Sequence, residues 1–226
     1  MPPGSSIVDL RNLLTQRFPH LRFGCAPQKP AETLPTGIAA LDQLLGGGLP
    51  RAQFTELIAG GHGSGSTEVI HELLRQAALH RQFLVLVDGA GSFDPGAENS
   101  AVLTRLLWIR CQKTTEALKA TDLLLRDRNF SLLVLDLKLN PAAELRRIPS
   151  STWYRYARLL EQNEATVLVI TPQQLVPVAA CRVALDSRLG IGALDQPRAE
   201  LLTCLRFKAA PARAETQLRE HLKEAV

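Results

Sequence analysis

The stretch Phe54–Ile70, FTELIAGGHGSGSTEVI, decides how the rest of the chain is interpreted. The apolar residues at its beginning, Phe54, Leu57 and Ile58, are typical of a β-strand. This strand leads into a turn that contains four glycines. The segment after the turn, Thr67–His80, has helical spacing. Glycines are needed in such a turn because the backbone must reach positive φ and come close to whatever it holds. The stretch therefore predicts a strand, a tight glycine-rich turn and a helix.

The turn also has the spacing of a phosphate-binding loop. Gly60, Gly65 and Thr67 match the pattern G-x-x-x-x-G-K-[ST] at every fixed position except one, where Ser66 replaces the lysine. The backbone N–H groups can still form a nest for an anion, and Thr67 can still offer its hydroxyl to magnesium. The missing charge would stabilise phosphoryl transfer, and loss of one such contact commonly slows a reaction about 10²- to 10³-fold. We predict a degenerate phosphate loop; a purely structural turn is the alternative.

A second candidate position is Asp136, which closes the apolar run SLLVLDL. A carboxylate at the end of such a strand can hold magnesium, directly or through water, or it can simply cap the next turn. No cofactor is expected to be required, and ATP with Mg²⁺ is retained as an alternative ligand. The candidate cofactor-binding residues are Gly60, Gly61, His62, Gly63, Ser64, Gly65, Ser66, Thr67 and Asp136.

Strand-like and helical segments alternate after the turn. Apolar strand-like runs lie at 83–87, 106–111, 131–137 and 166–170, helical segments lie at 114–126 and 150–162, and two closing strands are expected at 182–186 and 201–207. This alternation predicts an α/β fold with a mostly parallel twisted sheet, helices on both faces and antiparallel closing strands. Ligands in such sheets bind at the carboxyl ends of strands, so the turn, Asp88 and Asp136 should meet at one edge.

Three regions are expected along the chain. Residues 1–33 contain leucine and isoleucine at helical spacing and then several prolines, which indicates a short helix and a linker. Residues 34–207 form the core, and residues 208–226 form a charged tail. The terminal helix either docks a partner or packs on its own domain.

Composition excludes several classes of protein. The 226 residues are 46% hydrophobic and 21% charged, with a net charge of +4 and a pI near 9.1. No apolar run is long enough for a transmembrane helix, and no signal peptide or metal-ligand spacing is present, so a cytoplasmic protein without a metal site is expected. The basic excess is compatible with an acidic or nucleic-acid partner but is too small to establish one.

Arginines near aromatic residues are the candidates for nucleic-acid contact, because such side chains neutralise phosphate and stack on bases. The candidates are Arg146, Arg147, Arg155 and Arg158, the last two beside Trp153, Tyr154 and Tyr156. On a helix, however, Trp153 and Tyr156 share one face, and a core role is the favoured interpretation for them. No nucleophile, base and orienting residue occur together, so no catalytic residue is assigned.

Longer blocks of sequence resemble the RecA-type core. LPTGIAALDQLLGGGLPRAQFTELIAGG resembles the segment that leads into the family's phosphate loop, and FLVLVDGAGSFDP resembles the strand and loop that follow it. LLVLDL resembles the family's second nucleotide-contacting strand. The resemblance covers roughly residues 34–207. LLWIRCQKTTEALKATDLLLRDRNFSLLVLDL, ELRRIPSSTWYRYARL and LVITPQQLVP resemble, more closely, the ImuA-type proteins, RecA-like accessories of bacterial damage-induced mutagenesis.

This resemblance implies a role without catalysis. It aligns Ser66 with the loop lysine, Asp136 with the magnesium-side aspartate and Ala90 with the catalytic glutamate of a recombinase. In the same alignment, the second DNA-binding loop corresponds only to the short segment TPQQLVPVA. The implied function is a non-catalytic adaptor in SOS-induced, error-prone translesion synthesis and DNA repair. The implied partners are RecA, an inactive Y-family polymerase homologue of the ImuB type, an error-prone replicative-type polymerase, and DNA, contacted directly or through RecA.

Two other functions stay open. The chain is alternatively a DNA-dependent, recombinase-like ATPase in which a displaced lysine, such as Lys113 or Lys138, replaces Ser66. It is otherwise a cell-division inhibitor of the SulA type, a related RecA-like protein that binds the division protein FtsZ.

Overall fold

The computed structural model describes residues 32–60, 63–190, 192–193 and 196–210. The chain divides into two units, Met1–Glu32 and Thr33–Val226, and all but one of the described residues belong to the second. The helix expected within 1–33 and the tail from 211 onward lie outside the described residues.

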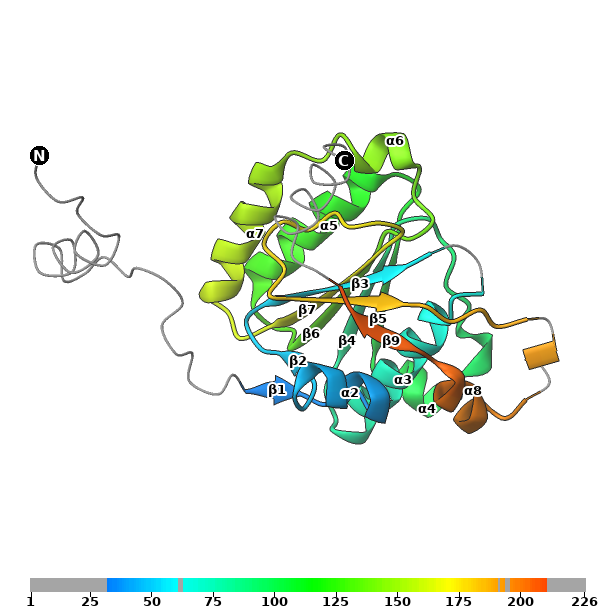
Figure 1. The fold of residues 1–226 in the computed structure, drawn as a ribbon. Helices are drawn as coiled ribbons and strands as arrows, with labels where there is room; N and C mark the ends of the chain where they lie inside the picture. The colour runs from blue at the N-terminus through cyan, green and yellow to red at the C-terminus, as the bar shows by residue number, and fades with distance from the viewer. Residues whose placement is uncertain (1–31, 61–62, 191, 194–195, 211–226) are drawn as a thin grey trace, which may run out of the picture. The chain divides into compact units, whose positions relative to one another are not determined.

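A twisted sheet forms the centre of the second unit (Figure 1). Its strands, from one edge to the other, are β5 (Leu106–Arg110), β4 (Leu84–Asp88), β6 (Leu132–Asp136), β7 (Thr166–Thr171), β3 (Phe54–Ala59), β8 (Cys181–Leu185) and β9 (Phe207–Ala209). All neighbours run parallel except β8 and β9, which are antiparallel. A separate antiparallel pair joins β1 (Thr33–Leu34) to β2 (Leu49–Pro50).

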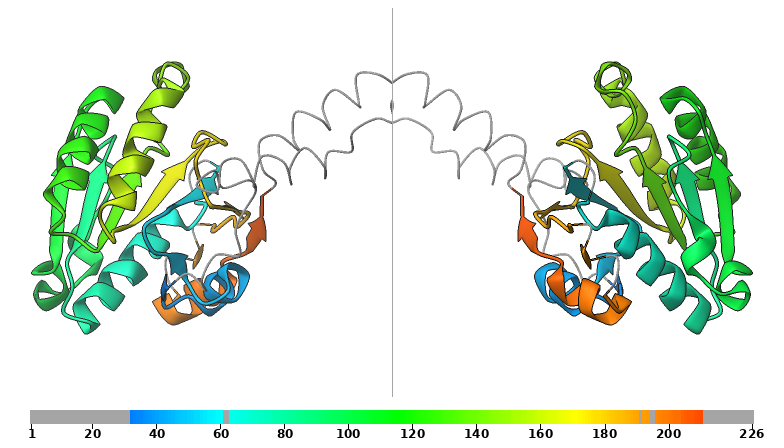
Figure 2. Two further views of the ribbon diagram at one scale, coloured as in Figure 1. Left: turned by 90° about the vertical axis from the view of Figure 1, so that its left-hand side faces the viewer. Right: turned by 90° about the vertical axis from the view of Figure 1, so that its right-hand side faces the viewer.

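Helices cover both faces of the sheet, as the two side views show (Figure 2). One face carries α2 (Ala39–Leu45), α3 (Ser66–Leu79), α4 (Ser100–Leu103) and α8 (Arg198–Cys204). The other carries α5 (Thr114–Asp127), α6 (Ala142–Leu145) and α7 (Ser150–Glu161). A short 3₁₀ helix, η1 (Pro95–Ala97), precedes α4. Across the ranges described, no helix has both the length and the apolar character needed to cross a bilayer.

Alternating side chains of the central strands build two separate cores. On β6, Leu132 and Val134 join the core under α3, whereas Leu133 and Leu135 join the core under α5 and α7. Successive residues of a strand point to opposite faces, so a strand covered on both sides must be apolar along its whole length. This is why the strand-like runs of the sequence are continuous rather than alternating.

The predicted fold class is confirmed, but the closing strands are partly wrong. The expected strand at 182–186 is β8, which runs parallel to β3, and only its pairing with β9 is antiparallel. Most of the expected strand at 201–207 is helix α8 and the turn after it, and β9 starts only at Phe207. Leu201 and Leu205 are four residues apart and both are buried, a helical spacing that a short apolar run does not reveal by itself.

The core role of the α7 aromatic residues is confirmed. Trp153 and Tyr156 are 1% and 0% exposed, and their rings pack edge to face. Tyr154, one position away from that face, is 57% exposed. The helical period therefore separates the packing aromatic residues from the single aromatic side chain that faces solvent.

Candidate functional site

The glycine-rich turn joins β3 to α3 at the carboxyl edge of the sheet (Figure 1). Gly63 and Gly65 have φ of 72° and 85°, values that residues with a Cβ rarely adopt. A Cβ at Gly65 would also lie 2.3 Å from Leu205 Cδ2. Gly65 is the N-cap of α3 and has no side chain to cap the helix, so the first N–H groups of α3 lack intrahelical partners. This end of the helix is suited to an anion.

A lysine from beyond another strand reaches the glycine-rich turn. Lys138 lies two residues beyond the end of β6, and its Nζ donates a hydrogen bond of 2.6 Å to Ser66 Oγ. Ser66 is fully buried, and Lys138 is half-buried. Of the two lysines considered from the sequence, Lys138 reaches the loop, whereas Lys113 lines a different cavity beside α5.

Asp136 and Asp88 end neighbouring strands in register, as predicted. Burial raises the pKa of Asp136, and the backbone N–H of Lys138 acts against that rise by donating to Oδ1 at 3.0 Å. Asp88 is fully buried and accepts bonds from the N–H groups of Ser92 and Phe93 and from Trp108 Nε1. The Asp88 carboxylate thus holds the loop after β4, while Asp136 lies beside the lysine that approaches the phosphate loop.

A cavity of about 270 Å³ opens at the phosphate loop. The loop and the start of α3 form one wall, and Lys138 lies in the lining. The opposite wall comes from the chain after β8, where the N–H of Leu189 donates to the carbonyl oxygen of Gly63 at 2.7 Å. The lining residues are Gly63, Ser64, Gly65, Thr67, Glu68, Lys138, Leu189, Gly190, Ala193 and Leu201. The lining of this cavity therefore combines a cation (Lys138), the N-terminus of α3 and a hydroxyl residue (Thr67).

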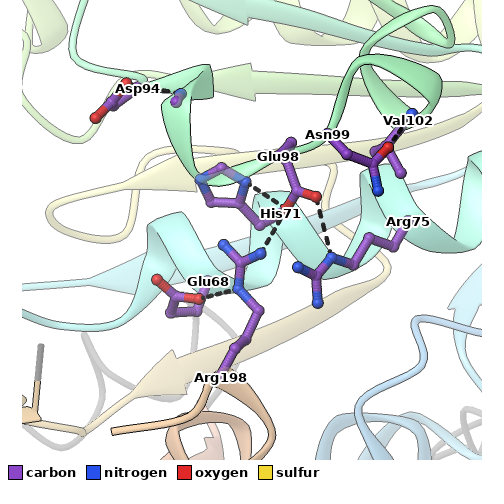
Figure 3. Close-up of polar contacts among 9 residues, drawn as sticks. Glu68, His71, Arg75, Asp94, Glu98, Asn99, Val102 and Arg198 are labelled. Atoms are coloured by element: carbon purple, nitrogen blue, oxygen red, sulfur yellow. Dashed lines mark hydrogen bonds and ion pairs between the residues drawn. The ribbon is translucent and has the colours of Figure 1, made fainter. Parts of the chain in front are cut away.

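A buried ionic cluster holds α8 against α3 beside this cavity (Figure 3). The Glu98 side chain, 1% exposed, accepts bonds from Arg75, His71 and Arg198, and Arg198 Nε also bonds Glu68 at 2.7 Å. Burial lowers the pKa of His71, and the positive charge of Arg198 lowers it further. Burial would raise the pKa of Glu98, but Arg75 and Arg198 outweigh it and the pKa is lowered. Because Arg198 also bonds Glu68, the carboxylate that lines the cavity belongs to the same ionic cluster.

A second buried carboxylate fixes the loop after β7. Glu56 Oε1 accepts the N–H groups of Leu175 and Val176 at 2.5 and 3.0 Å, and Oε2 accepts Arg182 Nε at 2.9 Å. Glu56 is fully buried, and Val176 is 1% exposed. This segment contains the reduced loop TPQQLVPVA, so its middle is tied to the sheet. The sequence offered one signal for this role, a single acidic residue inside the apolar strand β3.

The four arginine candidates do not converge on the phosphate-loop cavity. Arg146 and Arg147 are exposed after α6, and Arg147 lines the separate cavity that contains Lys113. Arg155 pairs with Asp122 at 3.1 Å and lies over the Tyr156 ring, and Arg158 is exposed on α7. Since Trp153 and Tyr156 are buried, they are not available to stack on bases.

Most of the phosphate-loop candidates that the structure describes are brought together. Gly63 to Thr67 surround the start of α3, and Asp136 lies two residues before Lys138. Gly61 and His62 lie outside the described residues. Among the residues with described positions, no group of three or more histidine, cysteine, aspartate or glutamate side chains is arranged to hold a metal. Glu68, Leu189 and Arg198 were not candidates, because no local pattern marks a contact between segments so distant in sequence.

The fold and the site define an α/β protein with a glycine-rich strand-to-helix turn at the carboxyl edge of a mostly parallel sheet. No protein-family model matches the chain. RecA of Streptomyces avermitilis is 29% identical over 167 residues, which are 66% of this chain and 44% of that protein. RecA of Rhodococcus jostii is 35% identical over 130 residues, 55% of this chain and 37% of that protein. The chain thus spans less than half the length of these curated relatives.

The RadB recombinase has a similar crystal structure, with a TM-score of 0.56 and 22% identity over 69% of this chain and 84% of the RadB chain. At that identity the likeness shows the fold alone. The sequence matches and the fold together relate the chain to the RecA-like superfamily.

Proposed function

We propose that this protein is a RecA-like adaptor, without recombinase-type turnover of ATP, in SOS-induced, error-prone translesion DNA synthesis in the cytoplasm. The proposal follows the ImuA-type resemblance. Its proposed partners are RecA, an inactive Y-family polymerase homologue of the ImuB type and an error-prone replicative-type polymerase, with DNA contacted directly or through RecA.

The observation that carries the proposal is a preserved scaffold whose acidic groups are occupied in internal contacts. Ala90, at the position where the resemblance aligns a catalytic glutamate, has no group that can act as a base. Asp88 is saturated by donors of its own loop, and Glu68, which lines the cavity, is bonded to Arg198. This arrangement supports a protein that keeps the RecA-like surface and has lost the means to activate an attacking water.

The anchored loop after β7 favours an adaptor over strand exchange. Because Glu56 holds the N–H groups of Leu175 and Val176, this loop would have to break buried hydrogen bonds before it could reach a DNA strand. We propose that the partners bind the outer surface of the core and the terminal segments, which lie outside the described residues.

A binding experiment tests the proposed partners. The full chain, immobilised, is exposed to purified RecA and to the inactive polymerase homologue, each with and without single-stranded DNA. We expect both proteins to be retained, and retention of RecA without DNA would separate a direct contact from one that DNA mediates. If neither partner is retained under either condition, the adaptor proposal is wrong.

The contact between Lys138 and Ser66 favours one second candidate, an ATPase with a displaced lysine. ATP turnover is measured with single-stranded DNA for the wild type, Lys138→Ala and Asp136→Ala. Turnover typical of an active recombinase, abolished by both substitutions, would support the ATPase and refute an adaptor without turnover. Background turnover in all three proteins supports the adaptor.

A further inference from the structure

A second cavity, of about 330 Å³, lies where α6 and the start of α7 meet the start of α5. This volume is within the usual range of ligand sites, which begins near 300 Å³. Among the described residues, the cavity shares no lining residue with the cavity at the glycine-rich turn. Its lining residues are Lys113, Thr114, Thr115, Leu118, Glu144, Arg147, Ile148 and Pro149.

Hydrogen bonds between the two walls hold this cavity open. Glu144 Oε2, from α6, accepts the backbone N–H of Thr114, the first residue of α5, at 3.0 Å. Asn140, which is 5% exposed, donates from Nδ2 to Thr114 Oγ1 at 3.0 Å and to the carbonyl oxygen of Gly89 at 2.9 Å. Because these bonds fix both walls before a ligand arrives, binding requires little ordering of the protein.

The charged part of the lining is mainly cationic. Lys113 and Arg147 are both exposed, and Glu144 is the one acidic residue in the described lining. Hydrogen bonds from Thr114 lower the pKa of Glu144, and the positive charges of Lys113 and Arg147 lower it further. The Glu144 carboxylate is therefore ionised at neutral pH and bonded to the start of α5. Two cations face this single anion, so the cavity attracts a further negatively charged group.

The uncharged part of the lining is aliphatic. Leu118 and Ile148 are half-buried and pack against the core under α5 and α7, and Pro149 adds a third apolar surface. The described lining contains no aromatic side chain on which a base can stack. Glu144 would also repel a nucleic-acid backbone, which carries a charge on every nucleotide. A peptide with carboxylates beside an apolar side chain matches this lining better than a nucleic acid does.

We propose that this cavity binds an acidic peptide segment of a protein partner. An apolar side chain of the segment packs on Leu118 and Ile148. The carboxylates of the segment pair with Lys113 and Arg147. The inference deepens the proposed function and rests on it, because it gives one protein contact of the adaptor a place and a chemistry. It also assigns Arg147, a candidate for nucleic-acid contact in the sequence, to the recognition of a protein.

Fluorescence polarisation of labelled synthetic peptides with the full chain tests the two halves of this recognition. The first peptide has a central leucine flanked on each side by two acidic residues. The second has the corresponding amides in place of the acids, and the third has serine in place of the leucine. We expect the first peptide to bind, and each of the others to bind at least about 3-fold more weakly, because each lacks one half of the recognised chemistry.

A double substitution tests the two cations. Lys113→Gln with Arg147→Gln should weaken binding of the first peptide about 2- to 25-fold, since an exposed ion pair contributes about 1.5- to 5-fold. Arg158→Gln with Lys208→Gln is the matched control, because it removes the same charge from exposed side chains outside the cavity, and it should bind as the wild type does. A thermal unfolding curve for each variant identifies any folding defect.

Four outcomes would overturn the inference. They are no binding of the first peptide by the wild type, equal binding of all three peptides, equal losses in the two double variants, and tighter binding of a single-stranded oligonucleotide through the same two cations.

The double variant also enters the partner experiment, where the two proposals fail separately. Retention of a partner that falls for Lys113→Gln with Arg147→Gln, and not for the control, would support the inference. Equal retention by the wild type and this variant would refute the inference and leave the adaptor proposal standing. If the wild type retains neither partner, the adaptor proposal is wrong, and the peptide titration still decides whether the cavity binds an acidic segment.

Discussion

Replacement of Glu56 by glutamine should strongly destabilise the protein, because it removes the buried negative charge with which Arg182 Nε pairs. Glu56 is fully buried and the Arg182 side chain is 8% exposed, with 2.9 Å between Nε and Oε2. A glutamine that keeps its oxygen on the N–H groups of Leu175 and Val176 turns its amide NH₂ group, a donor, toward Arg182. Breaking a buried pair in this way costs about 3–5 kcal/mol in the free energy of unfolding, which corresponds to a fall in Tm of roughly 6–20 °C.

Urea unfolding at neutral pH measures the effect, and a double-mutant cycle tests its cause. Glu56→Gln with Arg182→Met removes both charges, so the double variant should be more stable than Glu56→Gln alone. Asp186→Asn is the surface control: Asp186 pairs with Lys208 at 2.5 Å, but both side chains are largely exposed, and we expect no measurable change. Equal losses for the buried and the exposed pair, or strict additivity in the cycle, would refute the reasoning.

Two further substitutions probe the core and the loop. Burial raises the pKa of Tyr156 to about 12, and its hydroxyl donates to the carbonyl oxygen of Leu118 at 2.6 Å. Because the folded pKa lies above the unfolded value of 10, stability should be full below pH 10 and should fall by about 2–3 kcal/mol as the pH rises to 12. Denaturant unfolding in stepped buffers should show this loss in the wild type but not in Tyr156→Phe, and an identical pH slope in both proteins would contradict it. At the phosphate loop, Gly65→Ala combines a φ of 85° with a clash against Leu205 and should cost at least about 1–3 kcal/mol. Gly60→Ala, whose added Cβ meets nothing within 4 Å, should cost much less; similar midpoints in urea for the two variants would show that the backbone conformation at Gly65 is not constrained.

The local patterns of the chain were sufficient to predict its main elements. The helix at 114–126 is α5 and the helix at 150–162 is α7, each within one residue at its ends. The apolar runs that end at Asp88 and Asp136 are β4 and β6, which lie side by side. These predictions succeeded because strand and helix periods are properties of short segments. The prediction of a strand at 201–207 was wrong for the same reason, because a segment of seven residues is short enough to match either the strand period or the helix period.

The sequence by itself determined the parallel α/β framework, the glycine-rich turn before α3 and the absence of a lysine from that turn. Only the tertiary structure decided which distant groups face the turn: Lys138 rather than Lys113 near Ser66, Leu189 against Gly63, and Arg198 against Glu68. The reason is physical. Periodicity depends on neighbours along the chain, whereas a contact across 72 or 130 positions depends on the order of the strands and the packing of helices on them.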